Sequence, residues 1–291
     1  MIDSQHRLVD ADVGAIAAVV DSATNTDGVA PLSEQGMLRL RLRGGSPVLH
    51  FVTRDSGRIV GYAQLDPTSG AAELVVDPDQ RRRGIGRELM VRLLASVSGS
   101  ELEVWAHGDL PAARALADAM GFERVRSLWQ VGRPLTEDFP PPAIPEGVLV
   151  DTFRPGADDE QWVALNALAF ADHPEQGAWT LDDLHDRMNE PWFDPAGFFI
   201  ARRGPSMVGF HWTKVHDEST GEVYVIGIDP AEQGHGLGKA LTLVGLQHLA
   251  DIGLARVMLY VDESNRSAVR LYSGLGFERI ALDVMYARRR D

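Results

Sequence analysis

The chain has 291 residues, of which 44% are hydrophobic, so it can bury a sizeable core and is long enough for two domains. Its formal net charge of −14 would repel a phosphate backbone, which argues against a nucleic-acid partner. The absence of cysteine excludes disulfides, thiolate metal sites and a cysteine nucleophile, and it suits the cytoplasm. Neither a signal peptide nor a membrane span is apparent, so we expect a soluble cytoplasmic protein without a membrane partner.

The first half is predicted to run from a helical N-terminal part through a hairpin, a strand, a helix, a second strand and a last helix. The hairpin contains RIVGYA at positions 58–63, and the strand leads into DPDQRRRGIGREL at positions 77–89. The last helix ends before AMGFERV at positions 119–125. After it, Thr136–Gly147 carries four closely spaced prolines, which predicts a linker.

The second half repeats this order. Residues 198–203 and 207–215 flank the turn Gly204-Pro205-Ser206, as expected of a hairpin. EVYVIGID at positions 222–229 is typical of a buried strand, and it leads into DPAEQGHGLGKAL at positions 229–241. A helix is expected after Gly238, and GLGFERI at positions 274–280 again follows the last helix. We therefore predict a duplicated chain with domains at 1–139 and 148–291, joined by a linker at 140–147.

The doubled motif joins the end of a strand to the start of a helix. Such a junction offers free backbone N–H groups and a partial positive charge, and glycines there let phosphates approach closely. The motif fits neither the P-loop nor the dinucleotide fingerprint. What remains is Gln233-x-x-Gly236-x-Gly238 in one half and Arg81-x-x-Gly84-x-Gly86 in the other, which predicts a pyrophosphate site unless the glycines merely form a turn.

This pattern resembles the signature of the GCN5-related N-acetyltransferases (GNAT), once in each half. The resemblance implies an α/β fold of two tandem domains, each a mixed, mostly antiparallel sheet flanked by helices. It also implies acetyl-CoA as co-substrate and no metal. The residues expected to bind the coenzyme are Ile226, Gly227, Ile228, Gln233, Gly234, His235, Gly236, Leu237, Gly238, Lys239, Asn265, Arg266, Ser267, Ala268, Val269 and Arg270, and in the first half Leu74, Val75, Val76, Arg82, Arg83, Gly84, Ile85, Gly86 and Arg87.

Acyl transfer to an amine needs a base, a polarised carbonyl and a proton for the departing thiolate. Glu222 opens the strand before the motif and is the candidate base, and Tyr272 stands where the family often carries the general acid. Counting back by the repeat offsets places Gly70 opposite Glu222 and Ala117 opposite Tyr272. Neither can move a proton, so we expect the second half to be catalytic and the first to be a degenerate copy.

The tandem arrangement and stretches such as HPEQGAWT and HWTKVHD resemble the mycothiol synthase family. That resemblance implies acetylation of the cysteinyl amine of a cysteine, glucosamine and inositol conjugate, giving mycothiol and coenzyme A. The residues implied to contact this acceptor are Glu34, Glu175, Lys214, Glu222 and Tyr260. A different amine acceptor, such as an aminoglycoside or a protein N-terminus, and a non-enzymatic acyl-CoA sensor remain alternatives. The internal duplication favours a monomer.

Overall fold

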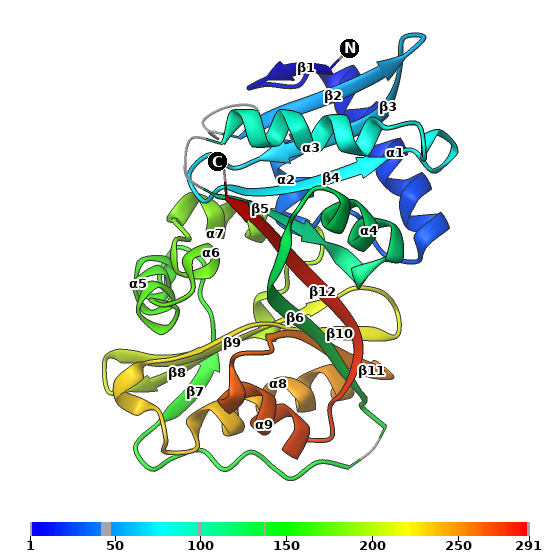
Figure 1. Cartoon of the computed structure of the whole chain (residues 1–291). Coiled ribbons are helices and arrows are strands. Elements are labelled where there is room, and N and C mark those ends of the chain that lie inside the picture. The colour runs from blue at the N-terminus through cyan, green and yellow to red at the C-terminus, as the bar shows by residue number, and fades with distance from the viewer. Residues whose placement is uncertain (1, 42–47, 98–100, 137, 290–291) are drawn as a thin grey trace. The chain divides into compact units, whose positions relative to one another are not determined.

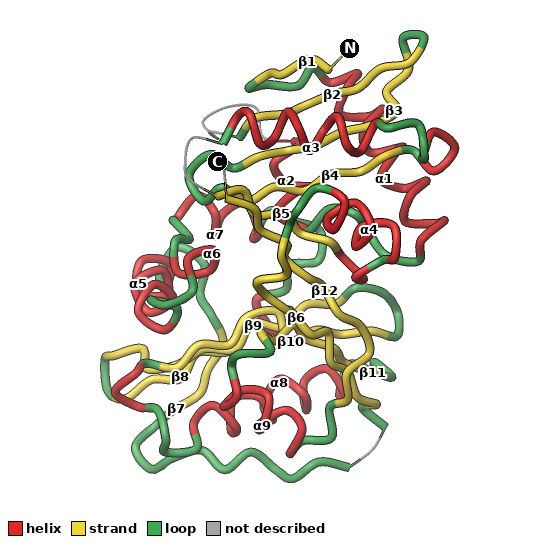
Figure 2. Tube along the Cα trace, in the orientation of Figure 1, coloured by secondary structure: helices red, strands yellow, loops and turns green. Residues whose placement is uncertain are grey.

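The computed structural model describes residues 2–41, 48–97, 101–136 and 138–289. The chain divides into two compact units. Unit 1 comprises Met1–Leu128 together with Ala281–Asp291, and unit 2 comprises Trp129–Ile280. Each unit contains a mixed sheet with helices packed against it, as Figure 2 shows by element type, so the predicted fold class is confirmed.

The sheet of unit 1 follows the order β1-β2-β3-β4-β5-β12. Its neighbours pair antiparallel, except that β4 and β5 are parallel. The chain's last strand therefore lies beside β5, in the register Val284 to Ala106. The strands are β1 (Ile2–Gln5), β2 (Leu49–Asp55), β3 (Arg58–Leu65), β4 (Ala71–Val76), β5 (Glu101–Ala106) and β12 (Glu278–Arg289).

Helices cover both faces of the unit 1 sheet. Leu89 and Leu93 of α3 pack with Phe51 on one face, whereas Ile16 of α1 packs with Tyr62 in a separate cluster. In Figure 1, α3 lies in front of the strands and α1 behind them. The α-helices of this unit are α1 (Asp10–Asp27), α2 (Glu34–Arg41), α3 (Ile85–Ser96) and α4 (Pro111–Ala119).

A buried ionic triad joins β12 to the rest of unit 1. Nε2 of His107 lies 3.0 Å from Oε1 of Glu73, and its Nδ1 lies 3.2 Å from Oδ2 of Asp283 on β12. Burial alone would lower the pKa of His107, but its hydrogen bonds to Asp283 and Glu73 outweigh burial and raise the pKa to about 10. The imidazolium thus balances two buried carboxylates.

The sheet of unit 2 follows the order β7-β8-β9-β10-β11-β6. β7 to β10 pair antiparallel, and β10 pairs parallel with β11. The predicted hairpin is present, with β8 and β9 joined through Gly204 and Pro205. The strands are β6 (Glu123–Pro134), β7 (Leu149–Thr152), β8 (Phe198–Arg203), β9 (Ser206–Val215), β10 (Thr220–Ile228) and β11 (Arg256–Asp262).

Two helical layers enclose this second sheet. Trp162 of α5 packs against Phe198 and Trp212 at ring-centroid distances of 5.7 and 5.9 Å, forming an aromatic core on one face. Leu241 of α8 packs with Val208 in a separate cluster. The α-helices are α5 (Asp159–Ala169), α6 (Pro174–Gly177), α7 (Leu181–Met188), α8 (Leu237–Asp251) and α9 (Arg266–Gly274).

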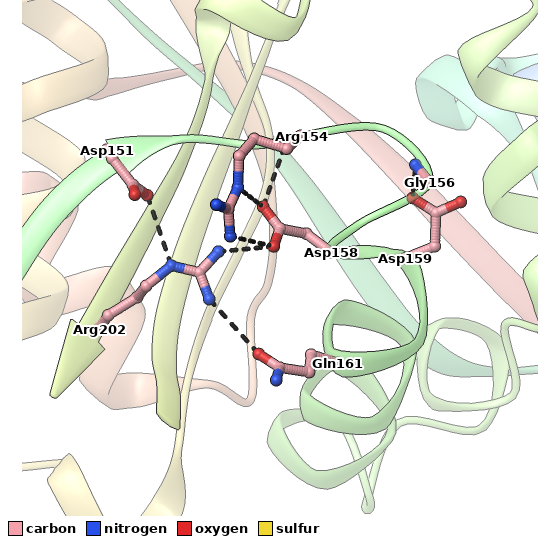
Figure 3. Close-up of polar contacts among 7 residues, drawn as sticks. All are labelled: Asp151, Arg154, Gly156, Asp158, Asp159, Gln161 and Arg202. Carbon is pink, nitrogen blue, oxygen red and sulfur yellow. Dashed lines mark hydrogen bonds and ion pairs between the residues drawn. The ribbon is translucent and has the colours of Figure 1, made fainter. Parts of the chain in front are cut away.

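An ion-pair network anchors the start of α5 to β8 (Figure 3). The carboxylate of Asp158, which is 2% exposed, lies 2.8 Å from Arg202 on β8 and 2.8 Å from Arg154. Arg202 is largely buried, but the side chain of Arg154 is 62% exposed. Asp158 is therefore the carboxylate that balances a buried guanidinium.

The two units do not coincide with the predicted domains. β6 begins in unit 1 and continues into unit 2 after Leu128, and β12 begins in unit 2 and continues into unit 1 after Ile280. Residues 138–145 contain no helix or strand, as a linker would, yet they fall within unit 2. The difference arises because a strand is grouped by its pairing partners, which lie far away in the sequence.

Candidate functional site

The two copies of the loop have the same backbone conformation. Asp77 and Asp229 each cap a short 3₁₀ helix, with φ near −48° and −50°, and each accepts a hydrogen bond from the N–H two residues on. Arg81 and Gln233 also correspond, because each side chain donates a 3.4 Å hydrogen bond to the carbonyl of the last residue in the preceding strand. The duplication predicted from sequence is thus present in the local geometry.

Left-handed backbone is required at the same two positions in both loops. Gly84 and Gly236 cap the following helix with φ of 85° and 86°. Gly234 has φ of 82°, but its counterpart is Arg82, with φ of 64°. A non-glycine residue is strained there, so the first copy keeps the loop conformation at an energetic cost.

Parallel strand pairing gathers the predicted coenzyme residues. β10 and β11 are parallel, and each is followed by a helix, so α8 and α9 begin at the same edge of the sheet. Ile226 to Ile228 end β10, and Gln233 to Lys239 form the loop and the first turn of α8. Asn265 caps α9 by accepting a hydrogen bond from the N–H of Ala268, and residues 266–270 form the helix start.

The equivalent place in unit 1 is a cavity of about 840 Å³. It is lined by the start of α3, the start of α4 and the end of β4, as the parallel pairing of β4 and β5 requires. The predicted residues that line it are Leu74, Val75, Val76, Arg82, Gly84, Ile85, Gly86 and Arg87. Among its further lining residues, His107 and Tyr286 come from segments that no sequence motif links to the loop.

The three consecutive arginines of the first loop have different partners. Arg81 lies with its guanidinium 2.6 Å from Asp27, and Arg83 lies 3.4 Å from Asp55. Arg82 is exposed and lines the cavity. Of the basic run, Arg82 is therefore the best placed for a phosphate, whereas Arg83 is outside the cavity lining.

Glu222 lies buried on β10, directly opposite Lys214 on β9. The Lys214 ammonium lies 4.4 Å from the centroid of the Trp192 ring and 5.1 Å from that of Tyr224. Two candidate substrate residues, one anionic and one cationic, thus face the same side of the sheet. Tyr260 lies on β11 and is 44% exposed, two residues beyond Met258, the neighbour of Glu222 on that strand.

A β-bulge distinguishes β10, the strand that carries Glu222, from its counterpart β4 in unit 1. The register of β10 on β9 shifts between Val223 and Val225, so Tyr224 is the extra residue. β4 pairs with β3 without interruption. When residues are matched by strand pairing rather than by sequence offset, the counterpart of Glu222 is Ala71 and not Gly70. The conclusion is unchanged, because alanine cannot accept a proton either.

Tyr272 lies in the core of unit 2 near the start of β12. It is 7% exposed, packs on Phe277 at 5.6 Å between ring centroids, and burial raises the pKa of its hydroxyl. The hydroxyl is therefore protonated throughout the physiological range. In unit 1 the carbonyl of Ala117 accepts a hydrogen bond from the N–H of Phe122. In unit 2 the carbonyl of Tyr272 accepts the same bond from the N–H of Phe277, so Ala117 is confirmed as the counterpart of Tyr272.

Two further substrate candidates come from helices. Glu34 begins α2 in unit 1 and is half-buried. Glu175 lies on α6 in unit 2, but its side chain is outside the described part of the structure.

Residues that no sequence motif singles out contact the bulge and Glu222. Arg187 of α7 donates a 2.9 Å hydrogen bond to the hydroxyl of Tyr224, and its guanidinium lies 3.6 Å from the centroid of the Trp179 ring. Nε2 of His216 lies 2.7 Å from Oε2 of Glu222. His211 is fully buried and contacts the carbonyl of Leu241 in α8. No short-range pattern links these residues.

Among the described residues, no cluster of three or more histidines, aspartates or glutamates is suited to hold a metal ion. Over the same residues, no helix combines the length and apolar character needed to cross a membrane.

Both halves match models of one acetyltransferase family. Residues 162–277 match the model described as the acetyltransferase (GNAT) family, and residues 46–124 match a model described as an acetyltransferase (GNAT) domain. A tandem GNAT protein from the clavulanic acid biosynthesis pathway superimposes with a TM-score of 0.73 at 20% identity, covering 99% of this chain and 98% of that one. The fold and its two loops therefore define a tandem GNAT acetyltransferase.

Curated relatives narrow this class. Mycothiol acetyltransferase of Thermobispora bispora is 54% identical over 284 residues, covering 95% of this chain and 96% of the relative. Mycothiol acetyltransferase of Thermomonospora curvata is also 54% identical, with 96% and 94% covered. The chain belongs to the mycothiol acetyltransferase family.

Proposed function

We propose that the protein acetylates the cysteinyl amine of the cysteine, glucosamine and inositol conjugate, using acetyl-CoA, to give mycothiol and coenzyme A. The observation that carries this proposal is the identity above 50% with mycothiol acetyltransferases over nearly the whole chain. The arrangement in unit 2 supports it, because the buried carboxylate of Glu222 lies on β10, the strand that leads into the coenzyme loop, directly opposite Lys214 on β9.

The coenzyme would be held at the start of α8. The N–H groups of the first turn of an α-helix have no intrahelical partner, and here they would donate hydrogen bonds to the pyrophosphate oxygens. A Cβ built on Gly238 would meet only Ile228, at 3.6 Å, so the backbone there is open to close approach. When bound, acetyl-CoA supplies the activated acetyl group. The N–H groups of residues 226–228 are the candidates to bind its carbonyl oxygen.

We assign the chemistry to Glu222 and Tyr272. A carboxylate oxygen of Glu222 takes a proton from the substrate ammonium, directly or through a water, and the freed nitrogen lone pair forms the bond to the acetyl carbon. The carbon–sulfur bond then breaks, the hydroxyl of Tyr272 protonates the departing thiolate, and the second proton lost by the attacking nitrogen restores the Tyr272 hydroxyl. Because the reference pKa of an α-amine is about 7.7 to 8.0, a carboxylate base suffices near neutral pH.

The unit 1 cavity is proposed as a second coenzyme A site without catalysis. Its lining repeats the loop and helix start of unit 2, while Ala71 and Ala117 replace the proton-transfer groups. Glu34, Glu175, Lys214 and Tyr260 remain the proposed contacts of the acceptor. We expect the enzyme to act as a cytoplasmic monomer.

The test is steady-state coenzyme A release with the cysteinyl conjugate and, separately, with its des-cysteinyl form. Turnover with the cysteinyl conjugate alone supports the proposal. Activity with neither compound would contradict the acceptor assignment and would favour a different amine, while binding of acetyl-CoA without turnover of any amine would favour a sensor.

A further inference from the structure

Glu222 has a direct partner that the proposed mechanism does not use. Nε2 of His216 lies 2.7 Å from Oε2 of Glu222. Because an ionised carboxylate can only accept, the imidazole must donate from Nε2. The side chain of Glu222 is 6% exposed and that of His216 is 36% exposed, so the contact links a buried anion to a side chain at the surface.

The hairpin between β9 and β10 brings these residues together. Lys214 is directly opposite Glu222, so His216, two residues on, lies on the same face as its diagonal neighbour. The N–H of His216 donates a 2.9 Å hydrogen bond to the carbonyl of Thr220, which closes the hairpin. His216 is therefore held by backbone pairing as well as by its side chain.

The turn after His216 is also fixed. Oδ1 of Asp217 accepts hydrogen bonds from the N–H and the hydroxyl of Ser219, each of 2.8 Å. These bonds lower the pKa of Asp217 to about 2, so it is ionised at all physiological pH values. A three-residue turn with this internal bonding leaves His216 little freedom to move away from Glu222.

We propose that His216 is a positioning residue for the acetyl transfer. Its hydrogen bond to Oε2 fixes the rotation of the Glu222 carboxylate and directs the other oxygen, Oε1, away from the imidazole. Oε1 is then the atom that accepts the proton of the substrate ammonium. The inference rests on the proposed role of Glu222 as base, and it adds the group that sets the orientation of that base.

The test compares His216→Ala with His216→Gln. Alanine removes the donor, and we expect kcat to fall by about 10- to 100-fold, as misorientation of a catalytic group does. The KM for acetyl-CoA should not change, since the coenzyme site is separate. The glutamine amide can donate from nearly the place of Nε2 and should restore most of kcat. His185→Ala is the matched control, because Nε2 of His185 lies 2.8 Å from Asp159 in the same unit.

Glu222→Gln separates this inference from the mechanism on which it rests. If Glu222→Gln abolishes turnover, His216→Ala alone lowers kcat by about 10- to 100-fold and His216→Gln restores most of it, the positioning role is supported. If Glu222→Gln abolishes turnover but His216→Ala retains the full rate, the positioning role is wrong and the base stands. If Glu222→Gln itself retains the rate, both are wrong. Equal losses in the His216 and His185 variants would also overturn the inference, because they would indicate a general effect on stability.

Discussion

At the scale of single residues, a glycine in the first turn of each loop helix allows coenzyme binding to be tested without loss of stability. Gly238 and Gly86 are equivalent, and a Cβ at either would meet only side-chain atoms, at 3.6 and 3.4 Å respectively. Gly238→Ala should therefore fold, and it should gain about 0.5–1 kcal/mol from helix propensity. Its methyl group would lie where phosphates approach, so acetyl-CoA affinity should fall about tenfold, or ~1.4 kcal/mol.

Calorimetric titration with acetyl-CoA and steady-state KM measure this effect. Gly86→Ala is the matched variant in unit 1, and it should leave the KM for turnover unchanged while removing a second binding event. Unchanged binding in Gly238→Ala would show that the helix start does not hold the coenzyme.

Asp158 is the residue whose loss should destabilise unit 2 most directly. Asp158→Ala leaves the largely buried Arg202 with the weaker partner Asp151, at 3.6 Å and 53% exposed, so we expect a loss near the lower end of the about 3–5 kcal/mol that breaking a buried pair costs. Arg154→Ala should change stability little, since that guanidinium is exposed. Urea denaturation of both variants checks this, and equal losses would contradict it.

At the scale of elements, the triad that ties β12 to unit 1 predicts a pH dependence. The pKa of His107 is raised from 6.5 to about 10, so its contribution to stability is complete below about pH 6.5 and is lost as the pH rises through 10. We expect the melting temperature of the protein to fall across this interval. Histidine-ring NMR should show an imidazolium at position 107 above pH 8, and a ring that titrates near 6.5 would contradict the triad.

Elements with strong local signals were predicted correctly, and elements defined by distant partners were not. The hairpin at Gly204, the loop helices and the buried strand at 222–229 follow from turn residues and apolar spacing within short windows. The placement of β12 beside β5 depends on residues more than 170 positions apart. The pairing of His216 with Glu222 and the bulge at Tyr224 likewise depend on strand register, which periodicity does not specify.

At the scale of the whole molecule, neither predicted domain contains all of one unit. Residues 1–139 lack the segment Ala281–Asp291, so β5 would lose its antiparallel neighbour and His107 would lose Asp283. We expect the fragment 1–139 to be unfolded or aggregated, because it exposes a strand edge and a buried ionic group. Joining residues 281–289 to it through a flexible linker should restore a cooperative melt by circular dichroism. A cooperative melt of the unmodified fragment would refute this expectation.

Because of the bulge at Tyr224, sequence counting and strand pairing give different equivalents of Glu222 in unit 1. Side chains alternate between the two faces of a strand, so adjacent positions point in opposite directions. A glutamate introduced at Gly70, the position that sequence counting suggests, would face away from the side that Glu222 occupies, and φ of 76° there disfavours any side chain. Strand pairing makes Ala71 the equivalent of Glu222, so a glutamate at Ala71, and not at Gly70, is the substitution that would place a carboxylate on the corresponding face of β4.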